Sequence, residues 1–270
     1  MKISAYGMTD TGMVRAGNED AFLVDEQCGL FAVADGMGGH NSGEVASRMA
    51  MEVMHDAIQR AVNGHDSAVV GGIDPHYSRA CNLLASAIRL ANRAIFEAAA
   101  SNQGWKGMGT TVAAVLAGAG RLAVAHVGDS RVYLIRDGKI SQLTADHSVV
   151  AEQLRKGMIS AEEARKSNIK NIITRALGQE PQIEVDLQEL EPMDGDRLLI
   201  CSDGLSGMVS DEEIVALINA RTSLPPACRD LVEQANAAGG RDNITAVLLS
   251  VELKDSLLSG LKGLLFGKSG

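Results

Sequence analysis

The residues with the clearest chemical potential are aspartates that stand at the ends of short apolar segments. One example is the segment 30–34, which runs directly into Asp35 and Gly36. Four aspartates follow such a segment or come shortly before one: Asp35, Asp129, Asp203 and Asp242. A single aspartate beside glycine is ordinary turn chemistry. Because strand ends can meet at one edge of a sheet, the fourfold repeat predicts that these carboxylates converge.

Converging carboxylates repel one another unless cations lie between them. The cationic side chains closest to them in the sequence are Arg131 and Arg241, fewer than the carboxylates. We therefore expect bound metal ions. No Cys or His stands at zinc-ligand spacing near these aspartates, and ligands that are all oxygen select Mg²⁺, Mn²⁺ or Ca²⁺. A site with two such ions is suited to the hydrolysis of phosphate esters.

The elements that must position this site can be predicted from the pattern of apolar residues. Short apolar segments bounded by Gly and Asp predict strands at 21–25, 30–34, 111–116, 121–127, 131–135, 197–201 and 244–251. Asp137-Gly138 predicts a hairpin turn into 139–143. Apolar residues at helical spacing predict helices at 43–62, 77–101, 211–220 and 225–238. Ser210 is placed to cap the third of these helices.

The links between many neighbouring strands are too short for a crossover helix, so we expect mainly antiparallel sheets covered by helices. The sequence has no internal repeat and no low-complexity linker, which favours one domain over two. The charged stretch 148–170 interrupts the strands and is the best candidate for a mobile insert.

Composition excludes several classes of protein. Hydrophobic residues make up 46% of the 270 residues but aromatic residues only 3%, which argues against stacking platforms for single-stranded nucleic acid. With 25 basic and 34 acidic residues the formal charge is −9, and such a protein lacks the field that attracts nucleic acid. The four cysteines form no CxxC pair, and no signal-type or 18-residue apolar segment is present. These features predict a cytoplasmic protein without a transmembrane segment.

Six short segments in one order give a more specific indication. They read RAGNED from Arg15, VADGMGGH from Val33, GTT from Gly109, VGDSR from Val127, CSDGL from Cys201 and RDNIT from Arg241. In this order they resemble the metal-dependent protein phosphatases of the 2C type, in their compact bacterial form. The resemblance spans about residues 6–251.

The resemblance implies an α+β fold, a four-layer α-β-β-α sandwich with two central, mainly antiparallel sheets and a flap insert. Residues 1–252 would form the catalytic domain, with the flap at about 144–178, and residues 253–270 would be a C-terminal tail. The implied enzyme is a metal-dependent protein serine/threonine phosphatase. It hydrolyses phosphoserine and phosphothreonine by direct attack of a metal-bridging hydroxide, with no phosphoenzyme.

The resemblance also implies a binuclear Mn²⁺ or Mg²⁺ site. In that picture Asp35 bridges the two tightly bound ions and the Gly36 carbonyl binds one of them. Asp203 and Asp242 hold the other ion.

Further residues take supporting roles by the same resemblance. Glu19 and Asp20 act through metal-bound water or behind the ligands. Asp129 resembles the ligand of a third, weaker ion that it shares with Asp203. Arg15 corresponds to the arginine that binds the substrate phosphate, for which its planar fork is well suited.

An acid is needed to protonate the leaving oxygen, and His40 is the histidine closest to the metal motif. Eukaryotic relatives carry a histidine directly after the Asp-Gly pair, where this chain has Met37. Metal-bound water is therefore an alternative to His40 as the proton donor.

The flap and the tail each leave two interpretations open. Arg165, Lys166 and Lys170 of the flap are placed to meet a phosphopeptide, or the flap is a solvated helical hairpin. The tail has leucines at helical spacing and is either a docking helix or an end that frays.

The implied partners are phosphorylated protein substrates and a cognate Ser/Thr protein kinase, and we expect a monomer that acts in signalling. Two other functions remain open. One is a catalytically silent adaptor that binds phosphoproteins on the same fold, and the other is a hydrolase of small phosphate esters. The joint presence of Asp35, Asp203, Asp242 and Arg15 argues against the adaptor, which would not need the full metal set.

Overall fold

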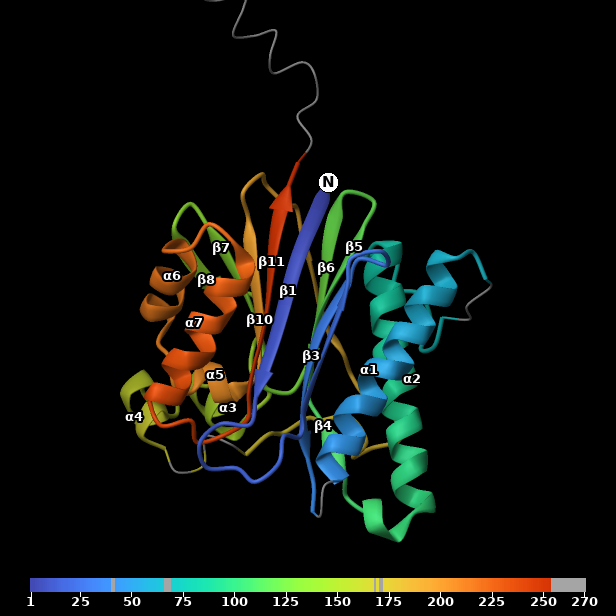
Figure 1. Cartoon of the computed structure of the whole chain (residues 1–270). Coiled ribbons are helices and arrows are strands. Elements are labelled where there is room, and N and C mark those ends of the chain that lie inside the picture. Colours follow the sequence, from blue (N-terminus) through green and yellow to red (C-terminus); the bar gives the residue numbers. More distant parts are fainter. Residues whose placement is uncertain (40–41, 66–68, 168, 170–171, 254–270) are drawn as a thin grey trace, which may run out of the picture.

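Two antiparallel sheets form the centre of the molecule, and a pair of helices covers the outer face of each (Figure 1). The structure is a computed structural model that describes residues 1–39, 42–65, 69–167, 169 and 172–253. The first sheet has the strand order β1-β11-β10-β7-β8 and the second the order β2-β3-β5-β6-β9, with the short β4 paired to β3.

The strands of the first sheet are β1 (Lys2–Asp10), β11 (Ile244–Glu252), β10 (Arg197–Cys201), β7 (Arg131–Arg136) and β8 (Lys139–Gln142). Those of the second are β2 (Asp20–Asp25), β3 (Leu30–Met37), β5 (Val112–Gly118), β6 (Arg121–Val127) and β9 (Asp186–Leu190), with β4 at Gly109–Thr110. The helices are α1 (Ser42–Val62), α2 (Arg79–Ser101), α3 (Val149–Arg155), α4 (Ala161–Lys166), α5 (Asp203–Ser206), α6 (Asp211–Asn219) and α7 (Leu224–Ala237), with a 3₁₀ turn at Gln103–Trp105.

Three apolar layers hold these elements together. Aliphatic residues of both sheets meet in the middle, and α1 and α2 pack on the second sheet while α6 and α7 pack on the first. The alternation of side chains along β10 shows how one strand serves two layers. Leu198 and Ile200 face the other sheet, whereas Leu199 and Cys201 face the helices. This arrangement confirms the predicted α-β-β-α sandwich.

Local capping explains where several helices begin. Ser210 accepts a hydrogen bond from the Glu213 backbone while the Glu213 carboxylate accepts one from the Ser210 backbone, a capping box at the start of α6. The hydroxyl of Ser78 caps α2 by accepting a hydrogen bond from the backbone N–H of Cys81. This helix therefore begins at Arg79, two residues later than the predicted 77–101. Two prolines occupy the first turn of α7. Proline has no backbone N–H, but the N–H groups of a first turn have no partner within the helix, so no helical hydrogen bond is lost.

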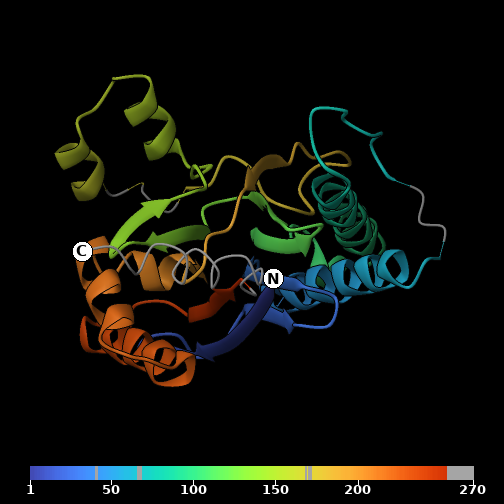
Figure 2. The same cartoon turned by 90° about the horizontal axis from the view of Figure 1, so that it is seen from above.

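The flap carries α3 and α4 and projects beside the first sheet (Figure 2). Its two ends meet at the base, where the Thr174 backbone donates to the His147 carbonyl at 2.8 Å and Ser148 forms a bridge with Ile173. Among the described residues, no helix combines the length and the apolar character needed to cross a membrane.

Three strands were not predicted: the short β4, and β1 and β9, each of which lies at one edge of its sheet. Three sequence-based expectations lie outside the described residues: His40, Lys170 and the tail beyond residue 253.

Candidate active site

The antiparallel pairing brings the acidic strand ends to one edge of the two sheets. Asp20 at the start of β2 lies directly opposite Asp35 near the end of β3. In the other sheet the end of β10 lies beside the start of β11, with Cys201 opposite Ala246. Asp203 and Asp242 flank these two strand ends, so four acidic residues from two sheets share one edge.

The backbone around Asp35 is fixed by three hydrogen bonds. The Asp35 N–H donates to the Thr111 hydroxyl at 3.0 Å, and its carbonyl accepts from the Thr110 hydroxyl and the Thr111 N–H, both at 2.9 Å. The next residue must be glycine, because a Cβ on Gly36 would lie 2.2 Å from the Gly43 carbonyl oxygen. The carbonyl of Gly36 is thus part of a rigid stretch of backbone.

Asp20 is buried and has one carboxylate oxygen satisfied and the other unpaired. Its Oδ2 accepts from the Ser202 hydroxyl at 2.8 Å and from the Thr245 hydroxyl at 2.6 Å. Its Oδ1 is buried and has no hydrogen-bond partner among the residues that the structure describes. A buried acceptor without a donor is costly, and a cation beside Oδ1 would remove that cost.

Asn243 ties the loop that precedes β2 to the start of β11. Its side-chain oxygen accepts from the Glu19 backbone at 2.8 Å. Its amide donates to the carbonyls of Thr11 and Gly17, both at 2.9 Å. The loop that carries Arg15 is thereby held next to Asp242.

Arg15 forms an ion pair with Asp242 at 2.7 Å between Nη2 and Oδ2. Its side chain remains 52% exposed, so the guanidinium can also contact a ligand from solvent. The pKa of Arg15 is raised, chiefly by the hydrogen bond to Asp242. The same Asp242 accepts from the Asn243 backbone through Oδ1.

The remaining carboxylates have strongly perturbed pKa values in the metal-free protein. Burial raises the pKa of Asp20 to about 6 and that of Asp129 to about 7, and the charge of Asp203 adds to both shifts. Burial followed by the neighbouring carboxylates, Asp20 first, raises the pKa of Asp35 well above its usual range. The pKa of Glu19 is also raised, mainly by desolvation.

These observations fit divalent metal ions. The donor set consists of carboxylate and carbonyl oxygens, which Mn²⁺ and Mg²⁺ prefer. Crowded carboxylates with raised pKa values gain most from a dication, since it replaces protons and cancels their repulsion. The unpaired Oδ1 of Asp20 supports the same conclusion.

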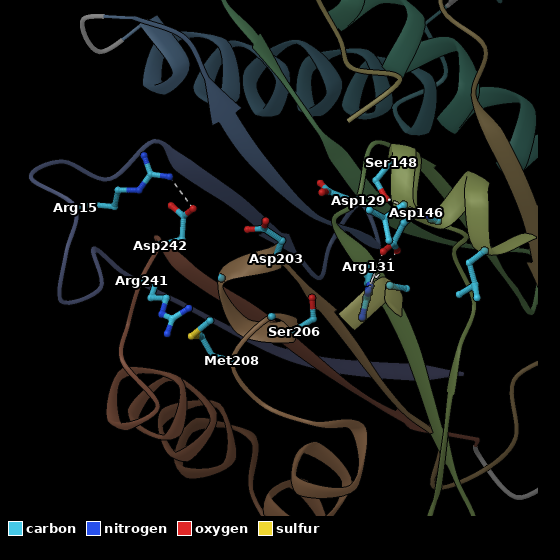
Figure 3. A pocket seen from close by; sticks show the side chains of 16 residues that line it. Arg15, Asp129, Arg131, Asp146, Ser148, Asp203, Ser206, Met208, Arg241 and Asp242 are labelled. Carbon is cyan, nitrogen blue, oxygen red and sulfur yellow. Dashed lines mark hydrogen bonds and ion pairs between the residues drawn. The ribbon is translucent and has the colours of Figure 1, made fainter. Parts of the chain in front are cut away.

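A cavity of about 690 Å³ opens at this edge between α5 and the flap (Figure 3). Asp129, Asp203 and Asp242 line its polar side, together with Arg15. The flap contributes the apolar residues Val150, Ala151, Leu154 and Ala164 beside the polar Asp146 and Ser148, and Met208 lies near Arg241 away from the flap. The cavity is therefore suited to a charged group attached to a larger body that can also contact the flap.

Several supporting contacts were not predicted from the sequence. Arg131 was expected near the aspartates, but its two-pronged ion pair with Asp146, with a shortest distance of 2.7 Å, was not. Ser202 and Thr245, which orient Asp20, were also missed. The available signal was their position in the same strand-end segments as Asp203 and Asp242.

The structure brings the predicted site residues that it describes to this one edge: Arg15, Glu19, Asp20, Asp35, Gly36, Asp129, Asp203 and Asp242. His40 lies outside the described residues. The side chains of Arg165 and Lys166 are also outside what the structure describes, so their proposed contacts with a phosphopeptide remain untested.

Comparisons with known proteins agree with this geometry. The family profile described as protein phosphatase 2C matches residues 14–249. A serine/threonine phosphatase Stp from Listeria welshimeri is 38% identical over 248 residues, which are 91% of this chain and 94% of that protein.

Solved structures give the same result. The structure of the serine/threonine phosphatase PstP/Ppp from Mycobacterium tuberculosis superposes with a TM-score of 0.82 at 37% identity, covering 94% of this chain and all of that one. The catalytic domain of PstP in complex with two manganese ions has a TM-score of 0.78 at 35% identity, covering 93% and 99%. The chain therefore belongs to the protein phosphatase 2C family.

Proposed function

We propose that this chain is a metal-dependent protein serine/threonine phosphatase. The observation that carries the proposal is the convergence of carboxylates from two sheets, with the unpaired Oδ1 of Asp20 among them, beside Arg15 in an open cavity. The names of the relatives, which are serine/threonine phosphatases, and the two manganese ions in the PstP structure support it.

Two Mn²⁺ or Mg²⁺ ions would be held by Asp35, the Gly36 carbonyl, Asp203 and Asp242. A third, weaker ion would be held by Asp129 together with Asp203. When bound, two such ions supply a nucleophile at neutral pH and stabilise the charge on the transferred phosphoryl group.

The other residues of the chain position the substrate and the ligands. Arg15 donates to the phosphate oxygens, and its link to Asp242 keeps the guanidinium at the mouth of the cavity. Glu19 and Asp20 act through metal-bound water or behind the ligands, and Asp20 is oriented for this by Ser202 and Thr245. His40 remains our candidate for the acid that protonates the leaving oxygen, with water as the alternative.

A phosphorylated protein is the substrate that the cavity supports best. Arg15 and the carboxylates suit the phosphate and its metal ions, while Val150 and Leu154 of the flap offer apolar contact to residues beside the phosphorylated one. A small phosphate ester would leave these flap residues unused. An adaptor without catalysis would have no use for the metal-holding carboxylates.

The remaining expectations complete the proposal. Residues 1–252 form the catalytic unit, the segment 144–178 is its flap, and 253–270 is a tail. The protein acts as a monomer in cytoplasmic signalling and opposes a cognate Ser/Thr protein kinase. The net charge of −9 supports protein partners over nucleic acid.

The first test is hydrolysis of a phosphothreonine peptide with Mn²⁺, with and without EDTA. We expect turnover that EDTA abolishes and that is lost in Asp35→Asn. Equal efficiency on the peptide and on p-nitrophenyl phosphate would contradict the assignment to protein substrates. Absence of turnover despite measured Mn²⁺ binding would favour the adaptor.

A further inference from the structure

A second group of metal-binding side chains lies at the far end of β2 from the catalytic edge. It consists of Asp25, the last residue of β2, Cys28 in the turn to β3, and His55 of α1. One carboxylate oxygen, the thiol sulfur and one imidazole nitrogen lie within 4.8 Å of one another. Asp25 is five residues from Asp20 along an extended strand, which places this group roughly 17 Å from the catalytic carboxylates.

The carboxylate of Asp25 is fixed in place by the turn. Its Oδ1 accepts from the backbone N–H groups of Gln27 at 2.8 Å and Cys28 at 2.9 Å. Its Oδ2 lies 2.8 Å from Nε2 of His55. The sulfur of Cys28 lies within 4.8 Å of both groups. The turn and α1 thus bring a carboxylate, an imidazole and a thiol to one place.

The imidazole and the thiol become metal ligands when the binding nitrogen and the sulfur carry no proton. One sulfur, one nitrogen and one oxygen ligand form a donor set that suits Zn²⁺, whereas Mn²⁺ and Mg²⁺ prefer oxygen alone. The group is accessible, since the side chains of Asp25 and His55 are 17% and 31% exposed and Cys28 is half-buried. Three protein ligands with access to solvent leave room for a water as the fourth ligand.

No competing cation occupies the group. Within the described residues, the ion-pair partner of Asp25 is His55, and no lysine or arginine pairs with it. The contrast is with His126, His147 and Asp186, which lie equally close together. There the Arg175 guanidinium already contacts Asp186 at 2.5 Å and lies 3.3 Å from Nε2 of His147. A metal ion at that second group would have to displace a guanidinium.

We propose that Asp25, Cys28 and His55 bind one Zn²⁺ ion, separate from the catalytic metals, which clamps the turn between β2 and β3 to α1. Binding breaks the S–H bond of Cys28 and releases that proton to solvent. His55 offers Nε2 to the ion and keeps its ring proton on Nδ1. The thiol therefore gives up one proton for each ion bound. No oxidant or other reactant is needed.

The site would stabilise the elements that carry catalytic residues without taking part in catalysis. The strands β2 and β3 also hold Asp20 and Asp35, and α1 packs against both strands. A ligand that binds only the folded state raises its stability. The inference does not depend on the proposed phosphatase activity.

The test uses the full-length protein saturated with Mn²⁺ and titrated with Co²⁺ and Zn²⁺. Co²⁺ reports a thiolate ligand through a charge-transfer absorption band, which the oxygen ligands of the catalytic site cannot produce. We expect one equivalent of Co²⁺ to produce this band and Zn²⁺ to remove it by displacing Co²⁺. We also expect calorimetry to give release of about one proton per Zn²⁺ and the melting temperature to rise with Zn²⁺.

Three variants decide the ligands. Cys28→Ser should abolish the band, and His55→Gln should weaken Zn²⁺ binding at least about tenfold, the loss seen even for residues behind a ligand. His76→Gln is the matched control, because His76 lies 2.8 Å from Asp74 in an exposed pair without a thiol; its Zn²⁺ binding should equal that of the wild type.

All three variants should keep Mn²⁺-dependent activity and circular dichroism, which shows that they fold. The proposal is overturned if the wild type shows no thiolate band, if the band survives in Cys28→Ser, or if folded His55→Gln binds Zn²⁺ as tightly as the wild type. In each case the contact between Asp25 and His55 would be a hydrogen-bonded link between the turn and α1 and nothing more.

Discussion

At the residue scale, our proposal requires ionised carboxylates as metal ligands, and a neutral amide cannot replace them. We predict that Asp35→Asn or Asp203→Asn lowers turnover of a phosphothreonine peptide by about 100-fold or more, since even changes behind a metal ligand cost that much. The fold should persist, because each change removes a negative charge from a crowded cluster. Initial rates at saturating Mn²⁺ and a circular dichroism melt measure the two effects. Wild-type turnover in either variant would refute the ligand assignment.

In our proposal Arg15 acts on the phosphate rather than on the metals, and its substitution should show this. We predict that Arg15→Ala lowers kcat/KM by about 10- to 100-fold, which corresponds to about 1.5–3 kcal/mol for a hydrogen bond to a charged group. Arg15→Lys should recover part of the loss, because an ammonium keeps the charge but lacks the fork.

The control for Arg15→Ala is calorimetric titration with Mn²⁺. Arg15 pairs with Asp242, so a change in metal affinity would mean that the arginine acts by positioning a ligand. Unchanged metal affinity with a higher KM supports direct contact with the phosphate.

At this scale the sequence predicts those site residues that lie in short local motifs. The aspartates beside glycine are visible as strand-end motifs, and so is the loop that contains Arg15. The contacts of Asp20 are not visible, because Ser202 and Thr245 are 182 and 225 residues away from it. Only the pairing of strands across the two sheets brings these hydroxyls to the carboxylate.

At the scale of the elements, two of the three missed strands, β1 and β9, were missed for the same reason. Both β1 and β9 lie at the edge of a sheet and have one neighbour each. Their residues are mostly half-buried, so β1 mixes apolar residues with Gly7 and polar groups, and β9 reads DLQEL. The central strands are buried on both faces and therefore read as continuous apolar runs.

We propose that the flap is the element most directly concerned with substrate choice. Leu154 of α3 lines the cavity and is 41% exposed. We predict that Leu154→Asp raises KM for a phosphothreonine peptide about tenfold, because the aspartate repels the acidic substrate and removes an apolar contact. Hydrolysis of p-nitrophenyl phosphate should change little, since this small ester reaches only the polar end.

Met158→Asp is the matched control for the flap. Met158 follows α3, is 68% exposed and lies outside the cavity lining, so it receives the same charge at a different place. Steady-state kinetics on both substrates compare the variants. If Met158→Asp and Leu154→Asp raise KM equally, the effect is one of general charge, and the proposed contact between Leu154 and the peptide is wrong.

At the scale of the whole molecule, the crowded carboxylates make stability depend on pH and on metal. Burial raises the pKa of Asp20 to about 6 and of Asp129 to about 7 in the metal-free protein. The unfolded chain has ordinary values near 4. Between about pH 4 and about pH 7 the folded state therefore binds more protons than the unfolded state, and stability must fall as pH rises through this range.

We predict that the protein in EDTA loses about 4 kcal/mol or less of unfolding free energy between about pH 5 and about pH 8 because of these groups. With saturating Mn²⁺ this loss should disappear at the upper pH, since the ions replace the protons and bind only the folded state. Urea unfolding at both pH values, with Mn²⁺ and with EDTA, measures the difference. The double variant Asp20→Asn, Asp129→Asn in EDTA should show a flatter pH dependence than the wild type. If stability falls with pH equally steeply in the two proteins, other groups cause the pH dependence. The repulsion among the carboxylates at this edge would then be weaker in the absence of metal than their burial implies.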